Sequence, residues 1–121
     1  MSLQLAGLET AGELAFHAGT LRRAVLNVVH NALEAMPQGG SLTLECIRTT
    51  TVVQLRVSDS GVGIPAEGVT RIFEPLYTTK PGGTGMGLYI VQQTLTAHGG
   101  RVTVESVEGQ GSTFTFILPA P

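Results

Sequence analysis

Residues 74–87 constrain the fold of this chain more than any other stretch. They contain Pro75, Pro81 and a series of glycines, so they cannot continue a helix or a strand. The regular structure must therefore form two groups, one on each side of this stretch. A long loop without regular structure is unusual in a small domain and is typically functional. Residues 74–87 are therefore the first candidate for a binding segment.

Both sides of this loop show the same order of elements. Apolar residues recur with helical spacing in two stretches, residues 21–36 and 88–98. Alternating apolar and polar residues predict four strands, over residues 41–48, 52–58, 101–106 and 112–118. Weaker patterns predict a short edge strand over 13–17, an N-cap at Thr20 and one or two helical turns over 66–73. Together they predict an α/β (α+β) two-layer sandwich, with a mixed, mainly antiparallel sheet covered on one face by helices.

Composition narrows the function classes. The chain has 121 residues, enough for a single domain with one core. Its net charge is -2 and only 13% of its residues are charged, which argues against the clustered basic surface that non-specific nucleic-acid or membrane binding requires. The single cysteine, Cys46, excludes an internal disulfide and a multi-cysteine zinc site. We therefore expect neither a nucleic-acid partner nor direct membrane contact.

The predicted helix over 21–36 carries a group of polar side chains on one face. Asn27, Asn31 and Glu34 have spacings that place them on one helical face. Such a face is often simply solvated, and this reading stays open. An asparagine carbonyl oxygen is, however, also a suitable ligand for Mg²⁺, which prefers oxygen and retains substrate phosphates.

Asp59 follows the predicted strand over 52–58 and precedes Gly61 and Gly63. A carboxylate at the end of a buried strand is a fixed hydrogen-bond acceptor, and the two glycines would let a flat ring approach the backbone. An ordinary Asx-turn after a strand is the alternative reading.

The segment before the helix over 88–98 has the character of a phosphate-binding loop. Lys80 supplies a positive charge, and backbone N–H groups at a helix N-terminus favour phosphate. Two known phosphate-binding patterns are absent: there is no Walker sequence, and Leu88 stands where the third glycine of GxGxxG belongs. The three histidines, His17, His30 and His98, show neither metal-ligand spacing nor a nucleophile-histidine-acid pattern.

Taken together, these segments resemble the ATP-binding domain of sensor histidine kinases, within the gyrase, heat-shock chaperone and MutL ATPase superfamily. The resemblance rests on five ordered motifs: residues 27–35 resemble the N box, 59–63 the G1 box, 73–80 the F box, 83–88 the G2 box and 111–116 the closing Gly–Thr strand. The end of the N box and the Thr-Thr-Lys stretch resemble nitrogen-regulation-type kinases. This family has the Bergerat-type ATP-binding fold.

The resemblance implies a role for each matching residue. Asn31 would bind Mg²⁺ between the ATP phosphates, with Asn27 nearby, and Asp59 would accept a hydrogen bond from the adenine amino group. Gly61 and Gly63 would let the base lie close, and Thr113 would lie near it. Residues 74–87 would form the ATP lid. The lid and the helix start would contact the nucleotide through Tyr77, Thr78, Lys80, Gly83, Gly85, Met86, Gly87 and Leu88. Asn27 and Lys80 would be the catalytic residues.

The resemblance also implies a reaction and its partners. The domain would transfer the γ-phosphoryl group of Mg-ATP to a histidine on a separate dimerisation domain, and through it to a response regulator. We expect a monomeric cytoplasmic domain, free or part of a membrane-bound sensor, that is a fragment without its own phosphoacceptor. Glu34 departs from the family, where Lys or Arg is common. A non-catalytic nucleotide sensor and a serine kinase or ATPase of the superfamily remain alternatives. The hydrolases use a Glu at the position of Asn27, which disfavours an ATPase.

Overall fold

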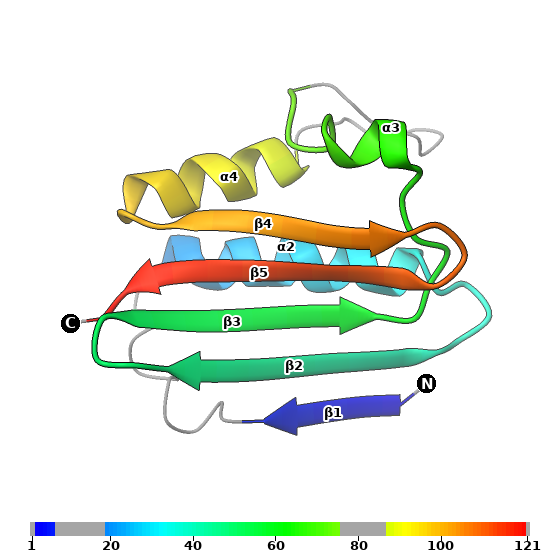
Figure 1. The fold of residues 1–121 in the computed structure, drawn as a ribbon, viewed down its shortest axis with the longest axis horizontal. Coiled ribbons are helices and arrows are strands. Elements are labelled where there is room, and N and C mark those ends of the chain that lie inside the picture. The colour runs from blue at the N-terminus through cyan, green and yellow to red at the C-terminus, as the bar shows by residue number, and fades with distance from the viewer. Residues whose placement is uncertain (1, 7–18, 76–86, 121) are drawn as a thin grey trace.

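The computed structural model describes residues 2–6, 19–75 and 87–120 (Figure 1). Its elements in chain order are β1 (Ser2–Ala6), α2 (Gly19–Glu34), β2 (Ser41–Arg48), β3 (Val52–Asp59), α3 (Ala66–Val69), α4 (Gly87–Ala97), β4 (Arg101–Val107) and β5 (Gly111–Pro119).

The strands form one five-stranded sheet in the order β1-β2-β3-β5-β4. β1 pairs with β2 in parallel, and the other neighbours pair antiparallel. The predicted mixed, mainly antiparallel sheet is therefore confirmed. The four strands predicted between residues 41 and 118 are present, each within one residue of its expected bounds.

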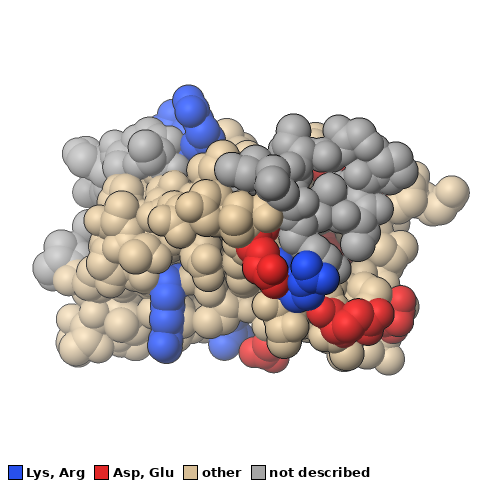
Figure 2. Space-filling model, turned by 90° about the horizontal axis from the view of Figure 1, so that it is seen from above, with Lys and Arg blue, Asp and Glu red and all other residues tan. Residues whose placement is uncertain are grey.

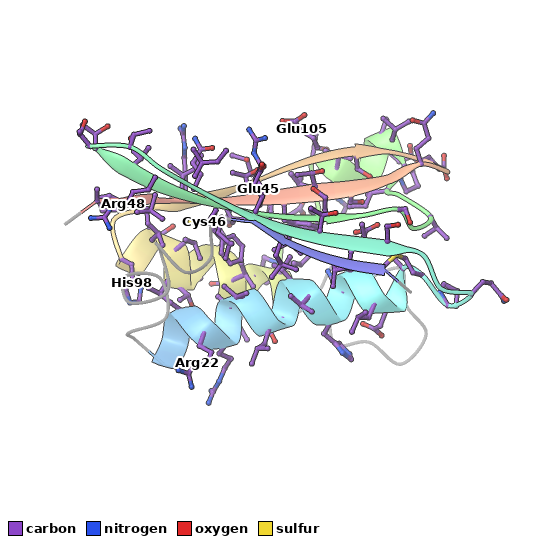
Figure 3. The ribbon with its side chains drawn as sticks, turned by 90° about the horizontal axis from the view of Figure 1, so that it is seen from below. Arg22, Glu45, Cys46, Arg48, His98 and Glu105 are labelled. Atoms are coloured by element: carbon purple, nitrogen blue, oxygen red, sulfur yellow. The ribbon has the colours of Figure 1, made fainter. Side chains whose placement is uncertain are left out.

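Helices cover one face of this sheet, as predicted. Figure 3 shows α2 and α4 on one side, with Cys46 directed toward them and Glu45 and Glu105 directed away. The apolar stripes of the helices meet the inward-facing strand residues, so that Val28 of α2 and Val91 and Leu95 of α4 are 0% exposed. Removal of this apolar surface from water is the main force that holds the two layers together.

Strand alternation assigns each side chain of β5 to one face of the sheet. Ser112, Phe114, Phe116 and Leu118 face the helices and are buried, whereas Thr113 belongs to the opposite, helix-free face. Phe73, the first residue of the predicted F box, packs edge-on against Phe114 with ring centroids 6.3 Å apart. This contact fixes the chain to the sheet just before residue 76, where the described part of the chain is interrupted.

The structure differs from the predictions at the start of one helix and at the end of another. α2 begins at Gly19, so Thr20 lies inside the helix and is not its N-cap. The helix predicted over 66–73 ends at Val69, because the following hydrogen bonds join residues three apart, as in turns: Arg71 N–H to Gly68 C=O and Glu74 N–H to Arg71 C=O. The edge strand predicted over 13–17 lies outside the described residues. β1 was not predicted, because Ser2–Ala6 is too short to show a clear pattern.

Candidate functional site

Asp59 is the last residue of β3 and lies at one end of the sheet. Its neighbours in the register are Leu42 of β2 and Ser112 of β5, both of which are buried on the helix side. Alternation along β3 places Asp59 on the same side as Val57, which is 1% exposed. A carboxylate is thus held at the rim of the apolar core, on the face that the helices cover.

The surroundings of Asp59 hold its side chain in one orientation. Its Oδ1 accepts a hydrogen bond from the Gly61 N–H at 2.9 Å. Burial raises the pKa of Asp59 above its ordinary value, and hydrogen bonds from the backbone of Gly61 and Ser112 oppose that shift. The side chain therefore offers a positioned acceptor whose desolvation strengthens a hydrogen bond to any donor placed there.

The glycines after Asp59 fit tightly against the protein itself. A Cβ on Gly61 would collide with the backbone of Ala35 at the end of α2, and a Cβ on Gly63 would collide with Val107 at the β4–β5 turn. Gly63 also has a φ of 72°, which favours glycine. The loop that carries Asp59 is therefore clamped between the end of α2 and the turn, so these glycines act in close packing in addition to their predicted role beside a base.

Asn27 and Asn31 lie on one edge of α2, in line with the clamp. Residues 27, 31 and 35 are spaced four apart, and the Val62 N–H donates to the Ala35 C=O at 3.1 Å. Both asparagines are half-buried, beside the apolar face that packs on the sheet. The helical rise places Asn31 about 6 Å and Asn27 about 12 Å from Ala35 along the axis. Polar groups thus extend from the Asp59 loop along α2.

Glu34 shares the helical face of Asn27 and Asn31 and lies beside His30. Its Oε1 lies 3.4 Å from His30 Nε2, and the two side chains are 43% and 74% exposed. Glu34 lies about 10 Å from Asn27 along the helix axis, which separates its carboxylate from a group beside Asn27.

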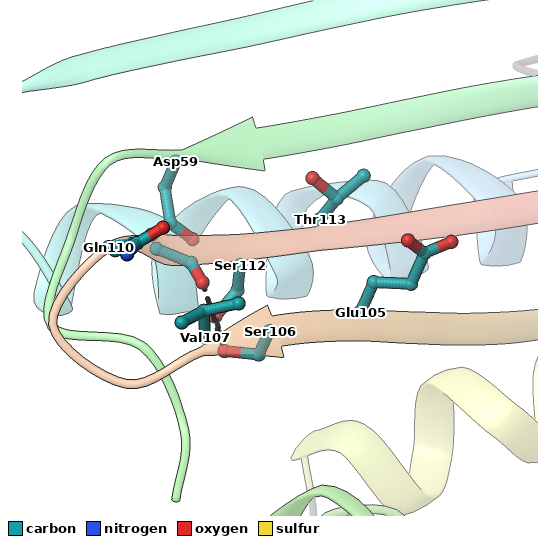
Figure 4. A pocket seen from close by; sticks show the side chains of 8 residues that line it. Asp59, Glu105, Ser106, Val107, Gln110, Ser112 and Thr113 are labelled. Atoms are coloured by element: carbon teal, nitrogen blue, oxygen red, sulfur yellow. Dashed lines mark hydrogen bonds between the residues drawn. The ribbon is translucent and has the colours of Figure 1, made fainter.

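A shallow cavity of about 260 Å³ lies at the same end of the sheet. Figure 4 shows the residues that line it, which are Asp59, Glu105, Ser106, Val107, Gln110, Gly111, Ser112 and Thr113. Because Glu105 and Thr113 lie on the helix-free face, the cavity reaches round the end of the sheet. Its described lining contains two carboxylates and no cationic side chain, so it suits hydrogen-bond donors and not phosphate groups.

The register separates Thr113 from Asp59. Thr113 Oγ1 lies 3.0 Å from Ser58 Oγ on the helix-free face, whereas Ser112 is the direct cross-strand neighbour of Asp59. Contact of Thr113 with the base stays a prediction, and the register adds Ser112 as the direct neighbour of Asp59. Sequence reasoning missed Ser112 and Ser106. The available signal was a serine in phase with the apolar residues of each alternating strand pattern.

The start of α4 contains the last two predicted nucleotide contacts. Gly87 is exposed at the first position of the helix, and Leu88 packs partly buried against the core. The N–H groups of a first helical turn have no partner within the helix, so this end favours an anion. The remaining predicted contacts lie outside the described residues; they are Tyr77, Thr78, Lys80, Gly83, Gly85 and Met86.

The described residues fit a magnesium ion that arrives together with ATP. They contain no cluster of three or more His, Cys, Asp or Glu side chains that could hold a metal ion alone. Mg²⁺ commonly binds through one or two protein oxygens together with substrate phosphates. The amide oxygens of Asn31 and Asn27, on the half-buried edge of α2, are donors of the required type.

Comparison with known proteins assigns the family. Residues 17–121 match the family described as "Histidine kinase-, DNA gyrase B-, and HSP90-like ATPase". This chain belongs to that family. Among its relatives is the sensor histidine kinase ZraS of Escherichia coli K12, which is 38% identical over 119 residues, 98% of this chain. The chain spans 26% of the length of that kinase. It is thus a histidine kinase-type ATPase domain of the kind found in sensor kinases.

Solved structures agree with this assignment. The catalytic domain of the histidine kinase ThkA has a TM-score of 0.80 and 32% identity, over 97% of this chain and 76% of that one. Full-length ShkA in complex with AMPPNP has a TM-score of 0.76 and 35% identity, over 84% of this chain and 21% of that one. The predicted Bergerat-type fold is therefore confirmed. The resemblance to nitrogen-regulation kinases stays a prediction.

The outer surface adds two observations. Figure 2 shows acidic side chains gathered toward one end of the face seen from above, with one basic side chain among them and other basic side chains apart. Arg71 Nε lies 3.2 Å from Glu74 Oε2. In the described ranges, every helix is too short or too polar to cross a lipid bilayer.

Proposed function

We propose that this chain binds Mg-ATP and transfers the γ-phosphoryl group to a histidine on a separate dimerisation domain, from which a response regulator receives it. The observation that carries the proposal is Asp59, a half-buried carboxylate fixed by the Gly61 N–H at the end of β3. The family and the AMPPNP complex of the related ShkA support a nucleotide as the ligand.

The base would bind at the Asp59 end. An ionised carboxylate only accepts hydrogen bonds, and the 6-amino group of adenine donates them. Guanine carries an acceptor oxygen at the same position, so a fixed acceptor discriminates between the two bases. The clamp at Gly61 and Gly63 holds this acceptor in place before the nucleotide arrives.

The phosphates would extend along α2 toward the start of α4. Asn31 and Asn27 lie on the edge of α2 that leads away from Asp59, and a bound Mg²⁺ would neutralise phosphate charge there. The N–H groups at Gly87 and Leu88 favour the same charges from the other side. Contact of Lys80 and the lid with the phosphates stays a prediction.

Transfer requires positioning more than covalent chemistry from this chain. The bond between the γ-phosphorus and the β–γ bridging oxygen breaks, a phosphorus–nitrogen bond to the acceptor histidine forms, and ADP leaves. Asn27 carries an amide that cannot take a proton from water near pH 7, and Glu34 lies about 10 Å from it along the helix axis. Water is therefore a poor competitor, which favours a kinase over an ATPase.

Calorimetry and phosphotransfer test this proposal together. We expect ATP binding that weakens when EDTA removes Mg²⁺, and acid-labile label from γ-labelled ATP on an added dimerisation domain that carries its acceptor histidine. Asn31→Ala should abolish transfer, whereas the matched variant Glu34→Ala, one turn along α2, should retain it.

The outcomes distinguish the alternatives. The chain alone should remain unlabelled, because His30 lies exposed on α2 and His98 Nδ1 is bonded to the Thr94 carbonyl at 2.8 Å. ATP binding without transfer to any supplied acceptor would support a nucleotide sensor. Turnover of several ATP per second without an acceptor would support an ATPase and contradict the proposal.

A further inference from the structure

Ser106 forms the centre of a hydrogen-bond network that joins three segments. Its Oγ accepts from the Ile64 N–H at 2.8 Å, donates to the Gly111 carbonyl at 3.0 Å and lies 2.8 Å from Ser112 Oγ. Figure 4 shows the bond between the two serines at the end of the β4–β5 hairpin. Ser106 therefore links the loop after Asp59 to the strand residue beside Asp59.

The chemistry of a hydroxyl fixes the direction of each bond. A serine hydroxyl has one proton and two lone pairs, and a carbonyl oxygen can only accept. Because Ser106 gives its one proton to Gly111, the bond between the serines must use the proton of Ser112. Ser106 is then fully satisfied, with one donated and two accepted hydrogen bonds.

The consequence concerns Ser112, which is 7% exposed and is the cross-strand neighbour of Asp59. With its proton committed to Ser106, Ser112 Oγ presents lone pairs alone to its remaining surroundings. Asp59, when ionised, also presents lone pairs alone. The rim of the core at this point is therefore an acceptor-only surface built from two side chains.

We propose that Ser106 is a positioning residue that sets base specificity, by holding the Ser112 hydroxyl as an acceptor beside Asp59. An acceptor-only surface matches the amino group of adenine and opposes the O6 of guanine. This inference rests on the proposed nucleotide binding. It adds the residue that makes Ser112, like Asp59, act only as a hydrogen-bond acceptor. Ser106 itself need not contact the nucleotide.

The test compares the ratio of ATP to GTP affinities, measured by calorimetry in Mg²⁺, between the parent chain and its variants. In Ser106→Ala the Ser112 proton is released and can donate to guanine O6, so the preference for ATP should fall by about tenfold or more. Ser106→Thr retains the hydroxyl in a residue that suits a strand, and should restore the parent ratio. Ser106→Cys retains the volume with a weaker hydrogen-bonding group and should give an intermediate ratio even if Ser106→Ala does not fold.

Ser58→Ala is the matched control. It removes a hydroxyl that also bonds across the strand to β5, at 3.0 Å from Thr113 Oγ1, but on the helix-free face. It should leave the ATP to GTP ratio unchanged. Ser106→Ala and Ser106→Cys with the parent ratio would overturn this inference alone, and a parent chain that binds neither nucleotide would overturn the proposed function as well.

Discussion

Two adjacent rows of residues cross the end of the sheet. Their side chains carry similar chemical groups but lie on opposite faces of the sheet. Asp59, Ser112 and Ser106 are paired across β3, β5 and β4, and face the helices. The next row is Ser58, Thr113 and Glu105, paired across the same strands on the helix-free face. Each row contains one carboxylate and two hydroxyls, and each contains a short hydroxyl-to-hydroxyl bond, of 2.8 Å and 3.0 Å.

The rows differ in their surroundings. The inner row lies at the rim of the apolar core: Ser112 is buried and burial raises the pKa of Asp59. In the outer row Glu105 is exposed. A hydrogen bond contributes more where water does not compete for it, so the same groups can select a ligand on one face and merely stabilise a strand pair on the other.

Exchange of the two carboxylates for amides should give the largest difference between the rows. Asp59→Asn can present an amide donor to the base and leave a buried polar group unpaired, so ATP affinity should fall by at least about tenfold, with loss of the preference over GTP. Glu105→Gln is the control and should change neither quantity. Calorimetry with both nucleotides measures the effect. Equal affinity of the parent chain for ATP and GTP would show that the inner row does not select the base.

Removal of the outer hydroxyl bond should affect stability alone. Thr113→Val leaves the part-buried Ser58 hydroxyl without its cross-strand partner, which should lower the free energy of unfolding by about 1 kcal/mol in urea titrations. ATP affinity should stay at the parent value. A weaker ATP affinity in Thr113→Val would show that Thr113 contacts the base and would remove the distinction between the rows.

The smallest expected effect is the pH dependence of stability. Because burial raises the pKa of Asp59 in the folded state, the folded chain binds its proton more tightly than the unfolded chain. The stabilising contribution of this proton is present below the unfolded-state pKa, about 4, and is lost as the pH rises through the folded-state value. Asp59→Asn should therefore gain stability relative to the nucleotide-free parent between about pH 4 and pH 7. Urea unfolding at several pH values measures the difference in the free energy of unfolding between the variant and the parent. If the parent becomes more stable relative to the variant as the pH rises, the predicted sign is wrong.

Much of the fold was predictable because local patterns and tertiary packing agree. The alternation in Val53, Leu55 and Val57 predicted a half-buried strand, and all three side chains are buried. The helical spacing over residues 21–36 predicted α2, which ends at Glu34. The pairing of β1 with β2 was not predictable, because it joins segments far apart in the chain and Ser2–Ala6 carries little pattern of its own.

The sequence by itself determined which groups are available: a carboxylate after a buried strand, two asparagines four residues apart, and glycines where the chain must pass close to itself. The tertiary structure decided which of them meet. Adjacent residues on a strand have opposite faces, so a register fixed by the whole sheet selects Ser112 and not Thr113 as the neighbour of Asp59. The direction of the Ser112 proton depends on Ile64 and Gly111, through Ser106. No sequence pattern within one segment can encode a hydrogen-bond network whose members come from three segments.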